Sequence, residues 1–160
     1  MIKLVVGLPG SGKTTYVKQH MRENDLAYDL DYLTAAFKCR EAHSKRKHIY
    51  ITEMVNDMLL SIIDNYSLYG LDDLYVIRTA PSHKECKYMA DKGADLIILD
   101  VSIDECMERI KDRNDGVNKE MFFIQKRFKR FKDNVNEYEW NSVFPPPKAL
   151  NHRLLGTEEG

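Results

Sequence analysis

Residues 7–14 form a glycine-rich segment whose spacing suits the binding of a phosphate chain. They read Gly7-Leu8-Pro9-Gly10-Ser11-Gly12-Lys13-Thr14 and fit the pattern G-x-x-x-x-G-K-[ST]. The glycines let backbone N–H groups wrap around a phosphate, an approach that side chains would obstruct. The apolar run Leu4-Val5-Val6 predicts a buried strand before the segment, and a helix is expected from Lys13 to about Arg22. We therefore expect a phosphate-binding loop here rather than an ordinary glycine-rich turn.

The side chains at the end of this loop predict the chemistry of the ligand. We expect Lys13 to reach the β- and γ-phosphates of a nucleoside triphosphate, and the Thr14 hydroxyl to ligate Mg²⁺. Thr15 is expected to add a phosphate contact. ATP and Mg²⁺ are thus the expected cofactors, and the expected cofactor-binding residues are Leu8, Pro9, Gly10, Ser11, Gly12, Lys13, Thr14 and Thr15.

Two aspartates lie at the end of the second predicted strand, which covers residues 25–30. Asp29 and Asp31 flank Leu30, so in an extended segment they share one face, at the strand end where ligands bind in parallel sheets. Asp31 is expected to accept the proton of an attacking hydroxyl, and Asp29 to contact the substrate. The alternative is that one aspartate only caps a helix that begins at Tyr32.

A third carboxylate lies near the end of the fourth predicted strand, residues 95–101, and two arginines follow that strand. Asp100 ends an apolar run in the manner of a Walker B magnesium ligand, which leaves Asp31 and Asp100 as competing candidates beside the metal. Arg109 and Arg113 are expected one turn apart on one helix face, in a segment that closes over the phosphates. The alternative for both arginines is surface pairing with nearby acids.

Further basic residues are candidates for binding the acceptor of a phosphate. Arg78 ends the third predicted strand, residues 74–78, and a buried charge is costly unless paired, so we expect it to face the site as a clamp. Residues 38–48 carry five Lys or Arg, among them Arg46, which we expect to contact an anionic acceptor. The alternative is a solvated helix face. The five histidines show no metal-ligand spacing, so no catalytic role is expected for them.

Helices between the four strands must position these side chains. An amphipathic pattern predicts a helix over residues 48–66, capping boxes begin helices at Ser82 and Ser102, and an apolar seam runs from Met121 to Tyr138. Strands that alternate with helices imply an α/β fold, a parallel sheet sandwiched between helical layers. Residues 1–144 are expected to form one domain, and residues 145–160, which open on three prolines, a tail.

Composition excludes several classes of protein. The chain has 160 residues, of which 43% are hydrophobic and 31% charged, with a formal net charge of −1, as expected for one globular domain. No apolar run approaches the roughly 18 residues of a membrane span, and no export signal is visible. The three cysteines, Cys39, Cys86 and Cys106, lack C-x-x-C spacing and are expected to be reduced thiols in a cytoplasm.

Taken together, these segments resemble a family of small phage and prophage P-loop ATP-binding proteins of the AAA type, grouped with polynucleotide 5′-hydroxyl kinases and small nucleoside or nucleotide kinases. The resemblance covers roughly residues 2–140. It is carried by five segments, which are Gly7–Thr15, Asp25–Asp31, Val76–Pro81, Leu99–Ser102 and Glu105–Ile110.

The resemblance implies a P-loop NTPase fold with strands in the order 2-3-1-4, and ATP and Mg²⁺ as cofactors. It also implies that Asp31 is the base and that Arg109 or Arg113 contacts the phosphates. We therefore expect an ATP-dependent phosphotransferase that acts on a hydroxyl or phosphate of a nucleic acid, nucleoside or nucleotide. The alternative is an ATP-binding switch that hydrolyses ATP slowly and works through a partner. The oligomeric state is left open.

Overall fold

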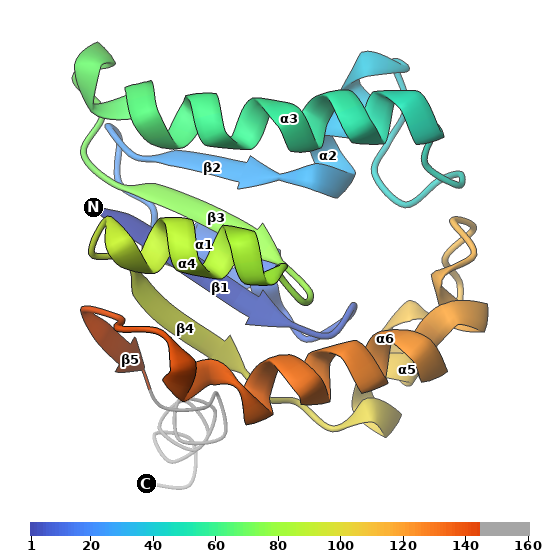
Figure 1. Cartoon of the computed structure of the whole chain (residues 1–160). Helices are drawn as coiled ribbons and strands as arrows, with labels where there is room; N and C mark the ends of the chain where they lie inside the picture. The colour runs from blue at the N-terminus through green and yellow to red at the C-terminus, as the bar shows by residue number, and fades with distance from the viewer. Residues whose placement is uncertain (145–160) are drawn as a thin grey trace, which may run out of the picture.

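A computed structural model describes residues 1–144, so the expected tail lies outside the described residues. Five parallel strands form one sheet in the order β2-β3-β1-β4-β5 (Figure 1). The strands are β1 (Ile2–Gly7), β2 (Leu26–Asp29), β3 (Leu74–Arg78), β4 (Asp95–Leu99) and β5 (Ser142–Phe144). The predicted α/β class and the order of the first four strands are confirmed.

The fifth strand was not predicted. It contains only three residues, too few to show a period of two, and its side chains are exposed. Its register is fixed by its neighbour, because Ser142 pairs with Asp95 of β4 and the Asn141 side chain donates a hydrogen bond to Asp95 at 2.7 Å.

Within residues 1–144, six α-helices connect and cover the strands. They are α1 (Lys13–His20), α2 (Leu30–Phe37), α3 (Ile49–Asn65), α4 (His83–Asp91), α5 (Ile103–Ile110) and α6 (Val117–Asp133), with short 3₁₀ turns η1 (Tyr66–Tyr69) and η2 (Val135–Glu137). In Figure 1, α3, α4 and α6 lie in front of the sheet, while α1 lies behind it.

The central strand β1 is buried on both faces, which explains its unbroken apolar run. Leu4, Val5 and Val6 are all fully buried. Leu4 and Val6 join the larger apolar core, which includes side chains of α3, α4 and α6, whereas Val5 packs with Val17 of α1 in the smaller one. Successive residues of a strand point to opposite faces, so one short run supplies both cores.

Several predicted boundaries were wrong by a few residues. The strand predicted over residues 25–30 ends at Asp29 because Leu30 begins α2, and the fourth ends at Leu99. The first helix stops at His20. The last ends at Asp133, so Val135 and Tyr138 of the predicted seam lie beyond it.

The two predicted capping boxes differ in the structure. Ser82 and Glu85 form both reciprocal hydrogen bonds at the start of α4. At Ser102 only one of the two is present, in which the backbone N–H of Glu105 donates to the Ser102 hydroxyl at 3.3 Å.

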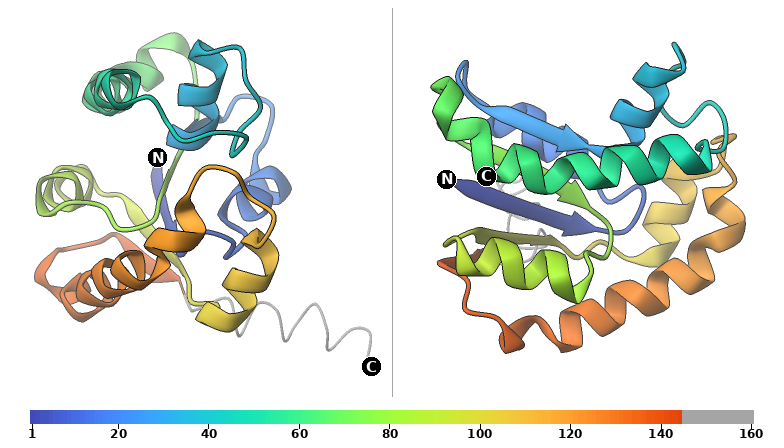
Figure 2. Two further views of the ribbon diagram at one scale, coloured as in Figure 1. Left: turned by 90° about the vertical axis from the view of Figure 1, so that its right-hand side faces the viewer. Right: turned by 45° about the horizontal axis from the view of Figure 1, so that its top comes forward.

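All strands run in one direction, so their carboxyl ends share one edge, at the right of Figure 1. The glycine-rich loop follows β1 at this edge, and α2, α5 and α6 begin nearby. Figure 2 shows that the segment between α2 and α3 lies close to the segment between α5 and α6. Over residues 1–144, every helix is too short or too polar to cross a membrane.

Candidate active site

The glycine-rich loop depends on glycine at the positions where its backbone is most unusual. Gly10 and Gly12 have φ of 84° and 91°, the left-handed region that glycine adopts readily. A Cβ on Gly10 would also lie 2.8 Å from the carbonyl oxygen of Cys106. The loop is therefore packed directly against the backbone of α5, with no room for a side chain between them.

Lys13 folds back over this loop. Its Nζ donates to the carbonyl oxygens of Gly7 at 2.7 Å and Leu8 at 2.8 Å. Burial lowers the pKa of Lys13 to about 8, against the opposing effect of the nearby Asp31 and Asp29 carboxylates. A bound phosphate would add negative charge beside the amine and favour its protonated form.

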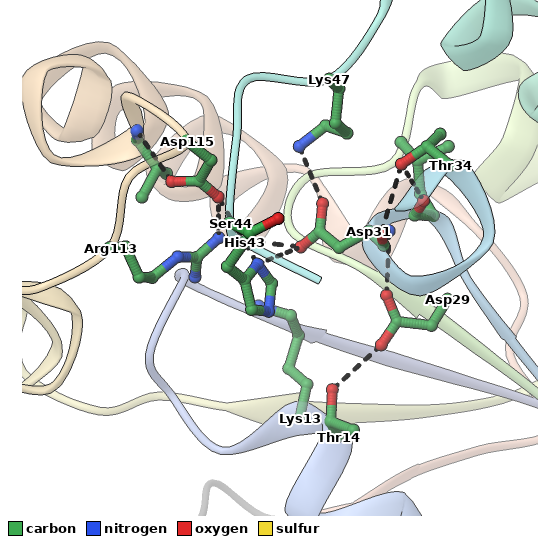
Figure 3. Close-up of polar contacts among 12 residues, drawn as sticks. Lys13, Thr14, Asp29, Asp31, Thr34, His43, Ser44, Lys47, Arg113 and Asp115 are labelled. Atoms are coloured by element: carbon green, nitrogen blue, oxygen red, sulfur yellow. Dashed lines mark hydrogen bonds and ion pairs between the residues drawn. The ribbon is translucent and has the colours of Figure 1, made fainter. Parts of the chain in front are cut away.

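Thr14 contacts an aspartate of the neighbouring strand. Its hydroxyl donates to Oδ2 of Asp29 at 3.0 Å (Figure 3). The other oxygen of Asp29 accepts from the backbone N–H of Asp31 at 3.1 Å and so caps α2. Burial, followed by the charge of Asp31, raises the pKa of Asp29.

This cap corrects the expectation that Asp29 and Asp31 share a face of an extended segment. An aspartate does cap a helix, but the helix begins at Leu30 rather than Tyr32. Asp29 therefore faces Thr14, and Asp31 lies in the first turn of α2.

The pair of Thr14 and Asp29 fits the requirements of a magnesium ion. Mg²⁺ prefers oxygen ligands and usually takes one or two from protein, the remainder being water and phosphate. A hydroxyl and a carboxylate already in contact beside a phosphate-binding loop supply such ligands. Asp100, which was predicted along with Asp31 as a carboxylate beside the metal, instead forms an ion pair with Lys132 at 3.0 Å and lines a different cavity.

Asp31 lies at the centre of a charged network (Figure 3). Lys47 Nζ donates to its Oδ1 at 2.8 Å, and its Oδ2 lies 3.6 Å from Nδ1 of His43 and 3.9 Å from Nη2 of Arg113. Burial alone would raise the pKa of Asp31, but these three partners outweigh it and hold that pKa below its ordinary value.

His43 extends the network to a second carboxylate, a role that sequence reasoning missed. Its Nδ1 lies 3.4 Å from Oδ2 of Asp115, which also accepts from Arg113. The backbone N–H of Asn114 donates to the carbonyl oxygen of His43 at 3.3 Å. These contacts join the segment before α3 to the segment before α6. The only sequence signal was a histidine within a basic segment, which indicates no partner.

The two predicted lid arginines do not share a helix face. Helix α5 ends at Ile110, so the chain has left the helix before Arg113. Arg109 donates to the carbonyl oxygen of Gly10 at 2.9 Å and pairs with Glu105 at 2.8 Å. One arginine thus contacts the glycine-rich loop, and the other lies beside Asp31.

Arg78 and Arg46 both have acidic partners. Arg78 is held by Asn56 at 3.0 Å and by Glu85 at 2.9 Å, so its charge already has a partner within the chain. Arg46, expected to bind the acceptor, pairs with Glu120 of α6 at 3.0 Å. Arg78 still lines the cleft described next, whereas Arg46 fastens two parts of the chain together.

A cleft of about 390 Å³ brings six of the predicted site residues together. It opens at the carboxyl ends of β2 and β3, between α3 and α6. Its lining includes Pro9, Lys13, Asp29, Asp31, Lys47, Arg78, Arg113 and Arg127. The other predicted site residues do not line it, namely Leu8, Gly10, Ser11, Gly12, Thr14, Thr15, Arg46 and Arg109.

Comparison with known proteins agrees with this geometry. No curated protein matches the chain. A family model described as an AAA domain matches residues 2–138, which include the glycine-rich loop, both aspartates and the arginine-bearing segment. The chain therefore belongs to this AAA domain family of the P-loop NTPase type, whose members bind nucleotides.

Proposed function

We propose that this protein is an ATP-dependent phosphotransferase that moves the γ-phosphate of ATP to a hydroxyl or phosphate of a nucleic-acid-type acceptor. The observation that carries the proposal is the shared cleft of Lys13, Asp31 and Arg113. A protein that only binds ATP needs the glycine-rich loop. Transfer to an acceptor also needs a base and a second positive charge, and the carboxylate of Asp31 and the guanidinium of Arg113 provide them in the same cleft.

Each step of the transfer to a hydroxyl has a side chain to support it. The acceptor oxygen forms a bond to the γ-phosphorus, the bond between that phosphorus and the β–γ bridging oxygen breaks, and ADP leaves. Asp31 takes the proton of the hydroxyl. Lys13 and Arg113 offset the negative charge on the transferring group.

Thr14 and Asp29 are the residues that would hold Mg²⁺ in this proposal. The ion would neutralise charge on the phosphates of the bound nucleotide. Asp29 has a second task in the same arrangement, because its cap on α2 fixes the backbone of Asp31. The magnesium pair and the base are thereby positioned by one carboxylate.

The acceptor class is supported by the charge of the cleft. Its lining combines lysines and arginines with three aspartates and one glutamate, and one of its aspartates is the proposed base. An anionic acceptor would be drawn to the cations, and its reacting group would have to meet Asp31.

A second candidate function is an ATP-binding switch, and one observation favours it. Asp31 pairs with Lys47 of the segment before α3 and with Arg113 of the segment before α6, so its carboxylate links the two segments. Nucleotide binding that disturbed these pairs would alter the surface formed by both segments, without any transfer.

One assay separates the two candidates. The protein is incubated with γ-labelled ATP and a panel of nucleosides, nucleoside monophosphates and 5′-hydroxyl oligonucleotides, and labelled product is measured. Transfer to at least one acceptor class is expected. Clear ATP binding with slow release of inorganic phosphate, and no labelled acceptor in any reaction, would favour the switch.

A further inference from the structure

The cleft at the proposed active site continues into a second cavity of about 490 Å³. Arg78, Ala80 and Arg127 line both, so the two cavities adjoin at these residues, and we treat them together as one groove. The second cavity lies between the start of α4 and the end of α6, and it reaches His83 and Tyr138. We call this second part the distal groove.

Helix α6 forms one wall along the whole length of the groove. Val117, Glu120, Ile124 and Arg127 line the first part, and Arg130 and Asn134 line the distal groove. The backbone N–H of Val117 donates to Asp115 at 3.2 Å, which places the first turn of α6 beside the Asp31 network. At 1.5 Å per residue, Arg127 and Arg130 lie about 15 and 20 Å further along the helix axis.

Arg127 and Arg130 differ from the other arginines near the site. Arg46, Arg109 and Arg113 each form an ion pair with an acid, whereas no such partner contacts Arg127 or Arg130 within residues 1–144. The distal groove also contains two glutamates. Glu85 is already paired with Arg78, which leaves only Glu137 against the two arginines.

Two aromatic side chains, His83 and Tyr138, line the distal groove together with these arginines. The Tyr138 hydroxyl and Nδ1 of His83 are 2.6 Å apart, and the Tyr138 ring packs edge-on against Trp140. These contacts hold the half-buried tyrosine ring in place. Aromatic rings next to arginines are the combination that binds single-stranded nucleic acid, by stacking and by charge.

We propose that Arg127 and Arg130 form a distal phosphate subsite, which binds a phosphodiester of the acceptor. The proposal rests on the proposed function, because it places the reacting end of the acceptor at Asp31. A stacked strand advances about 3.4 Å per nucleotide, so a separation of about 15 Å corresponds to four or five nucleotides, or fewer if the strand is extended. A nucleoside or mononucleotide is too short to occupy both ends of the groove.

The test measures binding of 3′-labelled 5′-hydroxyl oligothymidylates, from one to eight nucleotides long, by fluorescence anisotropy. Wild-type affinity should rise by about tenfold once the strand reaches the two arginines. The variant Arg127→Gln/Arg130→Gln should lose this gain, and its salt dependence should weaken by about 1.4 in log–log slope, the value for two single-strand phosphate contacts. Its affinity for ATP should not change.

The matched control is Lys84→Gln/Lys119→Gln, which removes the same two charges from α4 and α6. Both lysines are exposed and lie outside the lining of the groove. An uncharged methylphosphonate at the fourth or fifth linkage provides a second test, since it should weaken binding to the wild type and not to the arginine variant.

The subsite is overturned if affinity is independent of length, or if the control variant loses the gain equally. The same oligonucleotides tested with labelled ATP separate this outcome from a failure of the proposed function. Length-dependent binding without transfer contradicts the phosphotransferase and supports the groove. Transfer with equal KM at all lengths, unaffected in the arginine variant, supports the phosphotransferase and contradicts the subsite.

Discussion

Lys47 donates to Asp31 at 2.8 Å, so a residue of the basic segment contacts the proposed catalytic base directly. From the sequence, we expected the positively charged residues 38–48 to contact the acceptor. In the structure, Lys47 and Arg46 both pair with acids of the chain itself, Asp31 and Glu120. Lys47 therefore helps to lower the pKa of the base.

Lys47→Gln should shift the pH dependence of transfer. Lys47 is the main group that lowers the pKa of Asp31, so its loss should raise that pKa toward the ordinary value. Asp31 acts as a base only when deprotonated, and the acid-side fall in kcat/KM should therefore move to higher pH. Lys45→Gln, an exposed neighbour without an ion pair among the described residues, should leave the profile unchanged. A profile unchanged in both variants would remove Lys47 from this role.

Lys13→Ala should abolish transfer and weaken ATP binding. The loss in kcat should be at least about 100-fold, as for other groups that stabilise developing charge. Titration calorimetry and the labelled-phosphate assay measure the two effects. Lys18→Ala removes an exposed lysine from the same helix and serves as the control. Full activity of Lys13→Ala would contradict the role assigned to the glycine-rich loop.

Asp31→Asn should keep ATP binding and lose transfer by about 100-fold or more, because the amide preserves shape but cannot take a proton. Asp104→Asn, on the exposed first turn of α5, is the control. If ATP affinity fell as much as transfer in Asp31→Asn, the carboxylate would have a structural or metal-binding role instead.

Asp115→Asn should destabilise the protein in a pH-dependent manner. Burial opposes ionisation of Asp115, but Arg113 and His43 outweigh it and lower its pKa. A carboxyl group with a lowered folded-state pKa stabilises the fold above its unfolded pKa, and this contribution is lost as pH falls through the folded value. Urea unfolding should show a deficit of about 2 kcal/mol near neutral pH. The deficit should shrink as the pH falls below the ordinary pKa of an aspartate, and a constant deficit would contradict the ion pair as its cause.

Gly10→Ala should cost more stability than Gly70→Ala. Both glycines have positive φ, 84° and 77°, so both variants carry a backbone cost of about 1–2 kcal/mol. Only at Gly10 would the added Cβ also meet backbone, at 2.8 Å from the Cys106 carbonyl oxygen, whereas nothing lies within 4 Å at Gly70. Denaturant unfolding measures the difference. Equal losses would mean that α5 moves aside freely.

The parts of the fold predicted correctly depend on local sequence. The glycine-rich loop, the apolar strands such as Leu74–Arg78, and the amphipathic α3 each carry their signal within a few residues or a few turns. The predicted boundary between the second strand and the following helix was wrong. The Asp31 N–H donates a hydrogen bond to the Asp29 side chain, and this cap starts the helix directly after Asp29.

The charged network could not have been predicted in the same way. It joins Asp31, His43 and Asp115, which are far apart in the chain and show no common spacing. Arg78 illustrates a related limit. The sequence indicated that the Arg78 charge would be buried and that burying it unpaired would be unfavourable. Its partner Glu85 was not predicted, because Glu85 was already assigned to the cap of α4. In the structure the Glu85 carboxylate accepts from both the Ser82 backbone and Arg78.

The close approach of Gly10 to α5 also determines where the site can open. The loop backbone lies against Cys106 and Ile110, and Arg109 is bonded to the Gly10 carbonyl, so direct contacts hold α5 and the glycine-rich loop together. We therefore expect a motion that carries Arg113 toward or away from Asp31 to pivot in residues 111–116, after the last residue of α5. In such a motion Arg109 would stay with the loop while Arg113 travelled, which in the proposed function would divide the anchoring of ATP from the closing of the site.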